Sequence, residues 1–133
     1  MKYLYIICPL TALVVCQAIK TIYEIIKTKQ FNLKIITSSG GMPSAHASFI
    51  TSLTMIIGFK EGFTSSIFAL ALIFTMITCY DAVGVRYESG IHAQILNKQF
   101  NLEMKEKIGH KLTEVICGIV LGIIIACIFY FKF

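Results

Sequence analysis

Charged residues are scarce in this chain, and their scarcity excludes most classes of soluble protein. Only 14% of the 133 residues are Asp, Glu, Lys or Arg, whereas 56% are hydrophobic. A soluble core of this size cannot hide so much apolar surface. The chain is therefore expected to form one domain, residues 1–133, embedded in a lipid bilayer.

Acidic residues are the rarer charged group. Seven Asp and Glu stand against twelve Lys and Arg, which gives a formal net charge of +5. The basic residues lie at the edges of apolar runs, with no nucleic-acid-binding motif and no aromatic platform between them. This pattern argues against nucleic acid and favours anionic membrane lipids as partners.

The chain also has no CxxC pair, and no histidine lies near a cysteine at the spacing of metal ligands. All five cysteines lie inside apolar stretches, so we expect them to be small core or lipid-facing residues. They are Cys8, Cys16, Cys79, Cys117 and Cys127. The chain also shows no internal repeat and no low-complexity tract.

What the chain does have is long apolar stretches, which predict an all-α, polytopic membrane helix bundle. A membrane-spanning helix needs about 20 mostly apolar residues. We expect about four transmembrane helices, over residues 3–19, 43–59, 63–83 and 110–131. The second is short for a full span and opens with Pro43, which suits the first helical position. The polar stretch 87–107 is expected to form short helices at the membrane interface.

The distribution of positive charge orients these helices. Four spans put both termini and the turn at Lys60 on one side, and the two longer connections on the other. Lys2, Lys60 and Lys132 fall on the first side, and the other nine of the twelve basic residues fall on the second. The positive-inside rule then places both termini outside and the second side in the cytoplasm.

Three dense polar clusters lie at the ends of apolar segments, all on this cytoplasmic side. They contain two histidines, two carboxylates, an arginine and a glycine-rich turn. A membrane protein with no chemistry to perform has little reason to gather such groups at one depth, so they indicate an active site. The clusters are residues 38–46, 81–86 and 109–114.

The first cluster has the features of an anion site. Gly40 and Gly41 precede a helix start, where free backbone N–H groups and the positive end of the helix dipole favour phosphate. His46 lies one turn into that helix and could protonate a leaving oxygen. The alternative is a glycine hinge with Ser44 as a helix cap and His46 as an interfacial polar residue.

The third cluster pairs a histidine with a carboxylate. His110 and Glu114 are four residues apart, which on a helix places them on one face, where the carboxylate can hold the imidazole in one tautomer. Such an oriented histidine is a base or a nucleophile. A pair that only caps the helix is the alternative, but Glu114 precedes an apolar run, and carboxylates within membranes are costly and usually functional.

In the second cluster, Asp81 ends a long apolar run and Arg86 could clamp phosphate oxygens with its planar guanidinium. Gly84 between them would let both side chains turn inward. The alternative is an ion pair that seals the helix end. Glu88 and His92 repeat the four-residue spacing in a polar stretch, and we expect no functional part for them.

The ordered motifs Gly40–His46, Asp81–Arg86 and Gly109-His110 with Glu114-Val115 and Gly118 resemble the divergent PAP2 family of small membrane proteins. These proteins are related to acid phosphatases and vanadium-dependent haloperoxidases. The resemblance covers nearly the whole chain.

The resemblance implies roles for individual residues. Ser44 and His46 match a Pro-Ser-Gly-His motif that supplies a general acid, with Ala45 in place of glycine. His110 would be the nucleophile that forms a phosphohistidine, and Glu114 would orient it. No metal or other cofactor is implied.

Other parts of the pattern are missing. The chain contains no Arg-Pro pair, and Lys27 and Lys34 only faintly echo the first phosphatase motif. Arg86 is the best replacement for the phosphate clamp.

We therefore expect an enzyme that hydrolyses a lipid phosphate monoester, such as phosphatidylglycerophosphate or phosphatidate, or a prenyl diphosphate, at the cytoplasmic face. His110, His46 and Glu114 would be catalytic, while Gly40, Gly41, Ser44, Arg86 and Asp81 would bind substrate. One alternative is a metal site in which Asp81, Glu114 and a histidine hold a hard cation. Another is a lipid-phosphate-binding or transport-related protein without turnover.

The oligomeric state is open at this stage. Four short helices bury little surface between them, so the chain could also form a homodimer. Gly118 and Gly122 have the GxxxG spacing, a weak sign of close helix packing.

Overall fold

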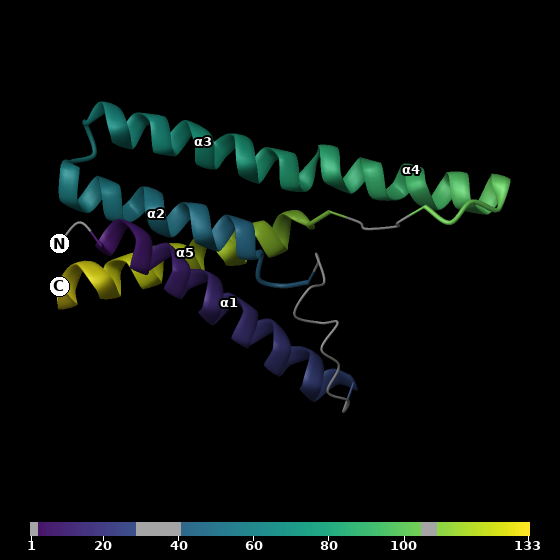
Figure 1. Cartoon of the computed structure of the whole chain (residues 1–133), viewed down its shortest axis with the longest axis horizontal. Coiled ribbons are helices and arrows are strands. Elements are labelled where there is room, and N and C mark those ends of the chain that lie inside the picture. The colour runs from purple at the N-terminus through teal and green to yellow at the C-terminus, as the bar shows by residue number, and fades with distance from the viewer. Residues whose placement is uncertain (1–2, 29–40, 105–108) are drawn as a thin grey trace.

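The computed structural model describes residues 3–28, 41–104 and 109–133, and within these ranges it contains helices and no strands. Figure 1 shows the helices in chain order. They are α1 (Leu4–Thr28), α2 (Ala45–Glu61), α3 (Ser66–Val83), α4 (Val85–Phe100) and α5 (Leu112–Lys132). The predicted all-α membrane bundle is confirmed.

In the part of the chain that the structure describes, three helical segments are long and apolar enough to cross a membrane: Leu4–Tyr23, Ser66–Phe100 and Leu112–Lys132. Helix α2 has 17 residues, or about 25 Å at the usual rise per residue. This is short of the roughly 30 Å hydrocarbon layer of a bilayer. That α2 is a fourth span therefore stays a prediction.

Helix α2 is the centre of the bundle. It packs against α1, α3 and α5, and Figure 1 shows it between α3 on one side and α1 with α5 on the other. All of its buried residues are small or β-branched, which lets three neighbours approach closely. They are Ala45, Ala47, Ser48, Ile50, Thr51, Ser52, Thr54, Ile56, Ile57 and Gly58.

The GxxxG spacing of α5 is used inside the chain. A Cβ atom on Gly118 would lie 2.5 Å from the backbone oxygen of Ser44, and one on Gly122 would lie 2.7 Å from that of Ser48. Such distances are far below van der Waals contact, so both positions require glycine. The two glycines thus bring α5 against the α2 backbone.

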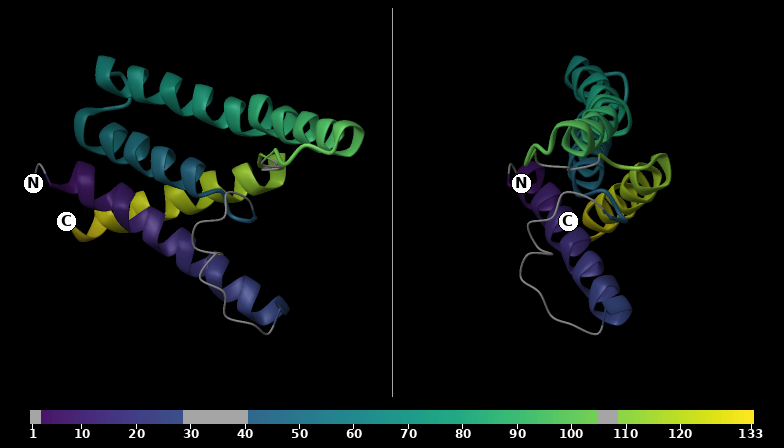
Figure 2. Two further views of the ribbon diagram at one scale, coloured as in Figure 1. Left: turned by 45° about the vertical axis from the view of Figure 1, so that its right-hand side comes forward. Right: turned by 90° about the vertical axis from the view of Figure 1, so that its right-hand side faces the viewer.

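Helix α4 differs from the predicted short interfacial helices. Residues 85–100 form one 16-residue helix that continues in the direction of α3 beyond the rest of the bundle (Figures 1 and 2). The reason lies at Gly84, whose N–H donates to Tyr80 O (2.8 Å) and whose C=O accepts from Glu88 N (3.0 Å). Helical hydrogen bonding therefore passes almost unbroken through the junction, and α4 ends only where Asn101 adopts a left-handed φ of 50°.

The two termini lie at the same end of the bundle as the turn between α2 and α3 (Figure 1). Aromatic rings gather there: Phe59 stacks on Tyr130 with centroids 4.8 Å apart and meets Phe63 edge-on at 5.5 Å. This agrees with the predicted grouping of the termini with the Lys60 turn. We refer to this end of the bundle, which contains Phe59, Phe63 and Tyr130, as the aromatic end.

Candidate functional site

The N-terminus of α2 is capped by Ser44 rather than started by Pro43. Ser44 is extended (φ −71°, ψ 118°) and its side chain accepts a hydrogen bond from Ala47 N. Pro43 therefore lies two residues before the helix, and its predicted place as the first helical residue is wrong. The physical reason is that serine can satisfy a free N–H of the first turn, which proline cannot.

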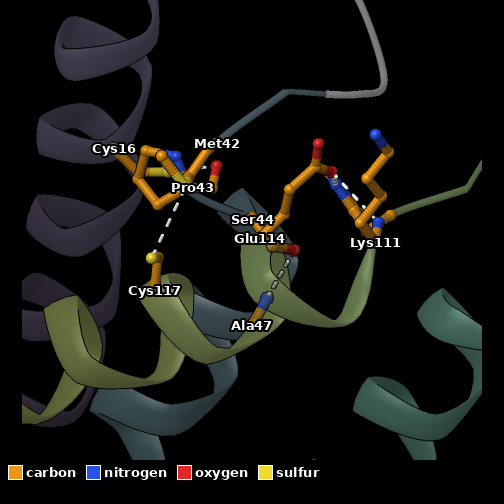
Figure 3. Close-up of polar contacts among 9 residues, drawn as sticks. Cys16, Met42, Pro43, Ser44, Ala47, Lys111, Glu114 and Cys117 are labelled. Atoms are coloured by element: carbon orange, nitrogen blue, oxygen red, sulfur yellow. Dashed lines mark hydrogen bonds and ion pairs between the residues drawn. The ribbon is translucent and has the colours of Figure 1, made fainter.

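Ser44 also joins α2 to α5. Its N–H donates to Glu114 O at 2.9 Å, and its side chain is fully buried. Figure 3 shows Ser44 beside Glu114 at the adjoining starts of the two helices. This hydrogen bond joins the first predicted polar cluster to the third.

His110 and Glu114 are in contact, although they do not share a helix face. Helix α5 begins at Leu112, so His110 precedes it. Glu114 folds back over the helix start, where its Oε2 accepts from Lys111 N (3.3 Å) and lies 2.8 Å from His110 Nδ1. The predicted pairing is thus present, but a helix-capping geometry produces it.

This pair is shielded from solvent. The side chains of His110 and Glu114 are 8% and 17% exposed. With the carboxylate on Nδ1, the imidazole is fixed in orientation, and Nε2 is left as its second reactive nitrogen.

Backbone hydrogen bonds hold the His110 segment against the α3–α4 junction. His110 N donates to Ala82 O (3.0 Å), and Gly109 N donates to Arg86 O (3.2 Å). A Cβ on Gly109 would lie 2.5 Å from Tyr87 N, so only glycine fits. The second cluster is thereby joined to the third, and all three predicted clusters meet in one place.

Asp81 and Arg86 form an ion pair, with Arg86 Nε 2.6 Å from Asp81 Oδ2. Their side chains are 36% and 53% exposed. An ion pair was the alternative that the sequence left open for the second cluster. In this pair, Asp81 orients the guanidinium of Arg86. The remaining guanidinium N–H groups of Arg86 have no partner among the described residues.

His46 stands in the first turn of α2, exposed, and lines a cavity of about 540 Å³ together with Arg86. Partial burial, and after it the nearby side chains of Arg86, His110 and Lys20, lower the pKa of His46. Two of the predicted catalytic residues, His46 and His110, therefore belong to one electrostatic environment with the predicted phosphate clamp.

Lys20 is the residue that sequence reasoning missed. It lies in α1 and is 6% exposed, close enough to Glu114 for their charges to attract. Among the side chains that the structure describes, it has no ion-pair partner. One sign in the sequence could have found it: Cys8, Ala12 and Cys16 continue at four-residue spacing to Lys20, and all four are buried.

Contacts of α1 with the α2 start hold Lys20 in place. One turn before it, Cys16 Sγ donates to Pro43 O at 3.3 Å (Figure 3). The lysine is therefore carried by a helix that is packed directly against the capped end of α2.

The glycine-rich turn is described only in part. Gly41 is exposed and has a positive φ of 82°, with open space around its Cβ position. Gly40, Lys34 and the side chain of Lys27 lie outside the described residues. The predicted phosphate cradle of this turn stays a prediction.

The described part of the chain contains no group of three or more His, Cys, Asp or Glu side chains placed to hold a metal ion. Asp81 is paired with Arg86 and Glu114 with His110. The alternative site made of Asp81, Glu114 and a histidine is therefore not assembled.

Comparison with known proteins shows which family the chain belongs to. The chain is 32% identical to "Uncharacterized membrane protein YuiD" of Bacillus subtilis (strain 168), over 93% of this chain and 92% of that protein. No solved structure matches. The model of the divergent PAP2 family matches residues 1–125, and the chain therefore belongs to the divergent PAP2 family.

Proposed function

We propose that this membrane protein hydrolyses a lipid phosphate monoester or diphosphate with His110 as nucleophile. The observation that carries the proposal is the buried His110–Glu114 pair, with Nδ1 and Oε2 2.8 Å apart, set against the capped start of α2. Lys20, Arg86 and His46 lie at the same end of the bundle and supply the basic groups that an anionic substrate requires.

The geometry supports a two-step reaction. Glu114 holds the Nδ1 proton, so the lone pair of Nε2 attacks phosphorus, a P–N bond forms, and the P–O bond to the lipid alcohol or phosphate breaks. His46, as imidazolium, gives its proton to the leaving oxygen. In the second step His46 takes a proton from water, the resulting hydroxide attacks phosphorus, and the P–N bond breaks to release phosphate and free His110.

Phosphate charge is balanced by three elements. Lys20 supplies a buried ammonium, Arg86 supplies N–H groups that Asp81 does not occupy, and the N-terminus of α2 supplies its dipole. Ser44 has its N–H on Glu114 and its hydroxyl on Ala47. We therefore assign it to positioning the first turn of α2, in place of the direct phosphate contact expected from sequence.

The membrane side follows from charge. The site lies at the end of the bundle away from the termini, and the excess of basic residues on that side favours the cytoplasm. The substrates that fit are lipids of the cytoplasmic leaflet, such as phosphatidylglycerophosphate or phosphatidic acid, and the termini would face outside.

A second function is lipid-phosphate binding without turnover. The ion pair of Arg86 with Asp81 favours it, because a clamp that is partly occupied stabilises transition-state charge less than a free one. In that case the protein would retain lipid phosphates and release no phosphate.

The test is phosphate release by the purified protein from a panel of lipid phosphates in mixed micelles, with and without chelator. His110→Ala is compared with His92→Ala, a histidine on the exposed face of α4. Chelator-resistant release that His110→Ala abolishes and His92→Ala retains supports the proposal. Lipid that co-purifies without any phosphate release favours the binding protein.

A further inference from the structure

The cavity beside His46 extends well beyond the groups that would touch a phosphate. Its volume is about 540 Å³, within the range of pockets that hold small ligands. Its lining has an apolar part, made by Leu13, Ala45, Phe49, Ile50 and Phe74, and a polar part, made by Gln17, His46, Thr78 and Arg86. The lining side chains used below are His46, Arg86, Leu13, Phe49, Ile50 and Phe74.

These residues run from the site into the apolar layer. Ile50 is one turn deeper than His46 on α2. Phe74 is three turns before Arg86 on the nearly continuous helix that α3 and α4 form. At 1.5 Å per residue, Phe74 lies about 18 Å along the helix from Arg86. On α1, Leu13 lies about 10 Å along the helix from Lys20, again away from the site.

The cavity is lined by α1 and α3, which lie on different sides of α2. In the described bundle, both helices pack on α2, and their backbones do not come close to one another. Leu13 comes from α1, Phe74 from α3, and Phe49 and Ile50 from α2 between them. Phe74 is 59% exposed, so this side of the cavity is accessible from the surroundings of the bundle, which are lipid at this depth.

We propose that this cavity binds a hydrocarbon chain of the substrate while its phosphate lies at His46 and Arg86. The identity of the phosphate site rests on the proposed function. Apolar lining side chains next to the guanidinium of Arg86 and the imidazole of His46 match one kind of ligand, a phosphate attached to a long apolar chain. The substrate then enters sideways from the bilayer, between α1 and α3. Affinity should rise about fourfold for each methylene that becomes buried, until the cavity is filled.

The chain contains no tryptophan, so a single introduced tryptophan reports what lies in the cavity. Phe74→Trp places the reporter in the lining. Ile77→Trp is the matched control, because Ile77 is on the same helix, is 60% exposed and is not part of the lining. Both are made with His110→Ala, which prevents turnover during the measurement, and are reconstituted in phosphatidylcholine vesicles.

The probe is phosphatidic acid with brominated chains, added at a low mole fraction. We expect saturable quenching of the Phe74→Trp fluorescence that excess unbrominated phosphatidic acid reverses, whereas Ile77→Trp is quenched only in proportion to the mole fraction. Equal quenching of both reporters would overturn the proposal. So would equal quenching by brominated phosphatidylcholine, which would show a cavity filled by bulk lipid.

Leu13→Trp provides the same reading from the α1 wall if Phe74→Trp does not fold. The two proposals fail separately. Saturable quenching with no phosphate release by the unsubstituted protein leaves the chain-binding cavity and removes the catalysis. Phosphate release without saturable quenching at either position leaves the catalysis and removes the cavity.

Discussion

The two ends of this bundle treat charge in opposite ways. At the aromatic end, Lys60 lies over the ring of Tyr130, 5.5 Å from its centroid, and Glu61 accepts a hydrogen bond from Tyr5. Each of these two charged groups has a partner on another helix. The opposite end holds the candidate site around His110, and we refer to it as the site end. There Lys20 is buried without an ion pair among the described side chains. Arg86 is bound to Asp81 through its Nε alone.

The ends also differ in what holds them together. Ring contacts among Phe59, Phe63 and Tyr130 dominate the aromatic end. The site end is joined by backbone hydrogen bonds between segments distant in sequence, such as Ser44 N to Glu114 O and His110 N to Ala82 O. Because main-chain groups join the segments there, side chains such as Arg86 are not needed to hold that end together, as the proposed function requires.

The largest expected effect comes from exchanging the carboxylate at each end for an amide. Glu114→Gln should lower kcat about 10²- to 10⁴-fold, since it removes the group that orients His110 and stabilises its positive charge. Glu61→Gln should leave kcat within about twofold, because Glu61 contacts only the aromatic end. The measurement is steady-state phosphate release. A similar loss in both variants would contradict a functional difference between the ends.

The two lysines give the next comparison. Lys20→Met should lower kcat/KM about 10- to 100-fold, the usual value of a hydrogen bond to a charged group. It should cause no loss of thermal stability, because it removes a buried charge that has no ion-pair partner among the described side chains. Lys60→Met should leave kcat/KM unchanged. A Lys20→Met protein with normal kinetics would remove Lys20 from the phosphate site.

Two glycines test how rigid each end is. In Gly118→Ala the new Cβ would lie 2.5 Å from the backbone oxygen of Ser44, whereas in Gly58→Ala it would lie 2.6 Å from a ring carbon of Phe63. A side chain can turn away and a helix backbone cannot. Gly118→Ala should therefore destabilise the fold by about 1–3 kcal/mol and Gly58→Ala by less, measured by thermal unfolding in detergent. The reverse order would mean that the aromatic end is the more rigid one.

The smallest effect is expected for the exposed ion pair. Asp81→Asn should change the free energy of unfolding by less than about 1 kcal/mol, as is usual for exposed pairs, and should free Arg86 for phosphate. Its KM should therefore stay equal or fall. A large rise in KM would show that Asp81 contacts the substrate itself.

Much of this arrangement could be predicted from sequence, because apolar length and charge bias are strong patterns in membrane proteins. These two patterns predict the membrane bundle and place the termini at the same end as the Lys60 turn. They also predict that the three polar clusters meet. The His110–Glu114 contact was also predicted, although its origin is a capping fold-back at Lys111 and not a shared helix face.

Other features depend on packing that no local pattern reveals. The sequence predicts that Lys20 is a helix residue near the membrane surface. Its burial arises only because α1 packs against the start of α2. The single helix α4 follows from hydrogen bonds that pass through Gly84, a residue type that usually ends helices. The apolar cavity needs three helices to be placed together, and sequence spacing within one helix cannot show it.

The most direct test of the account is to trap the covalent intermediate on His110. The protein is mixed with a lipid phosphate carrying a radiolabelled phosphoryl group, quenched rapidly in alkali, and digested to locate the label. A His110 nucleophile predicts label on the peptide that contains His110, stable in alkali and lost in acid as expected of a phosphohistidine, and no label in His110→Ala. Phosphate release by His110→Ala at the unsubstituted rate, or label on another residue, would contradict it.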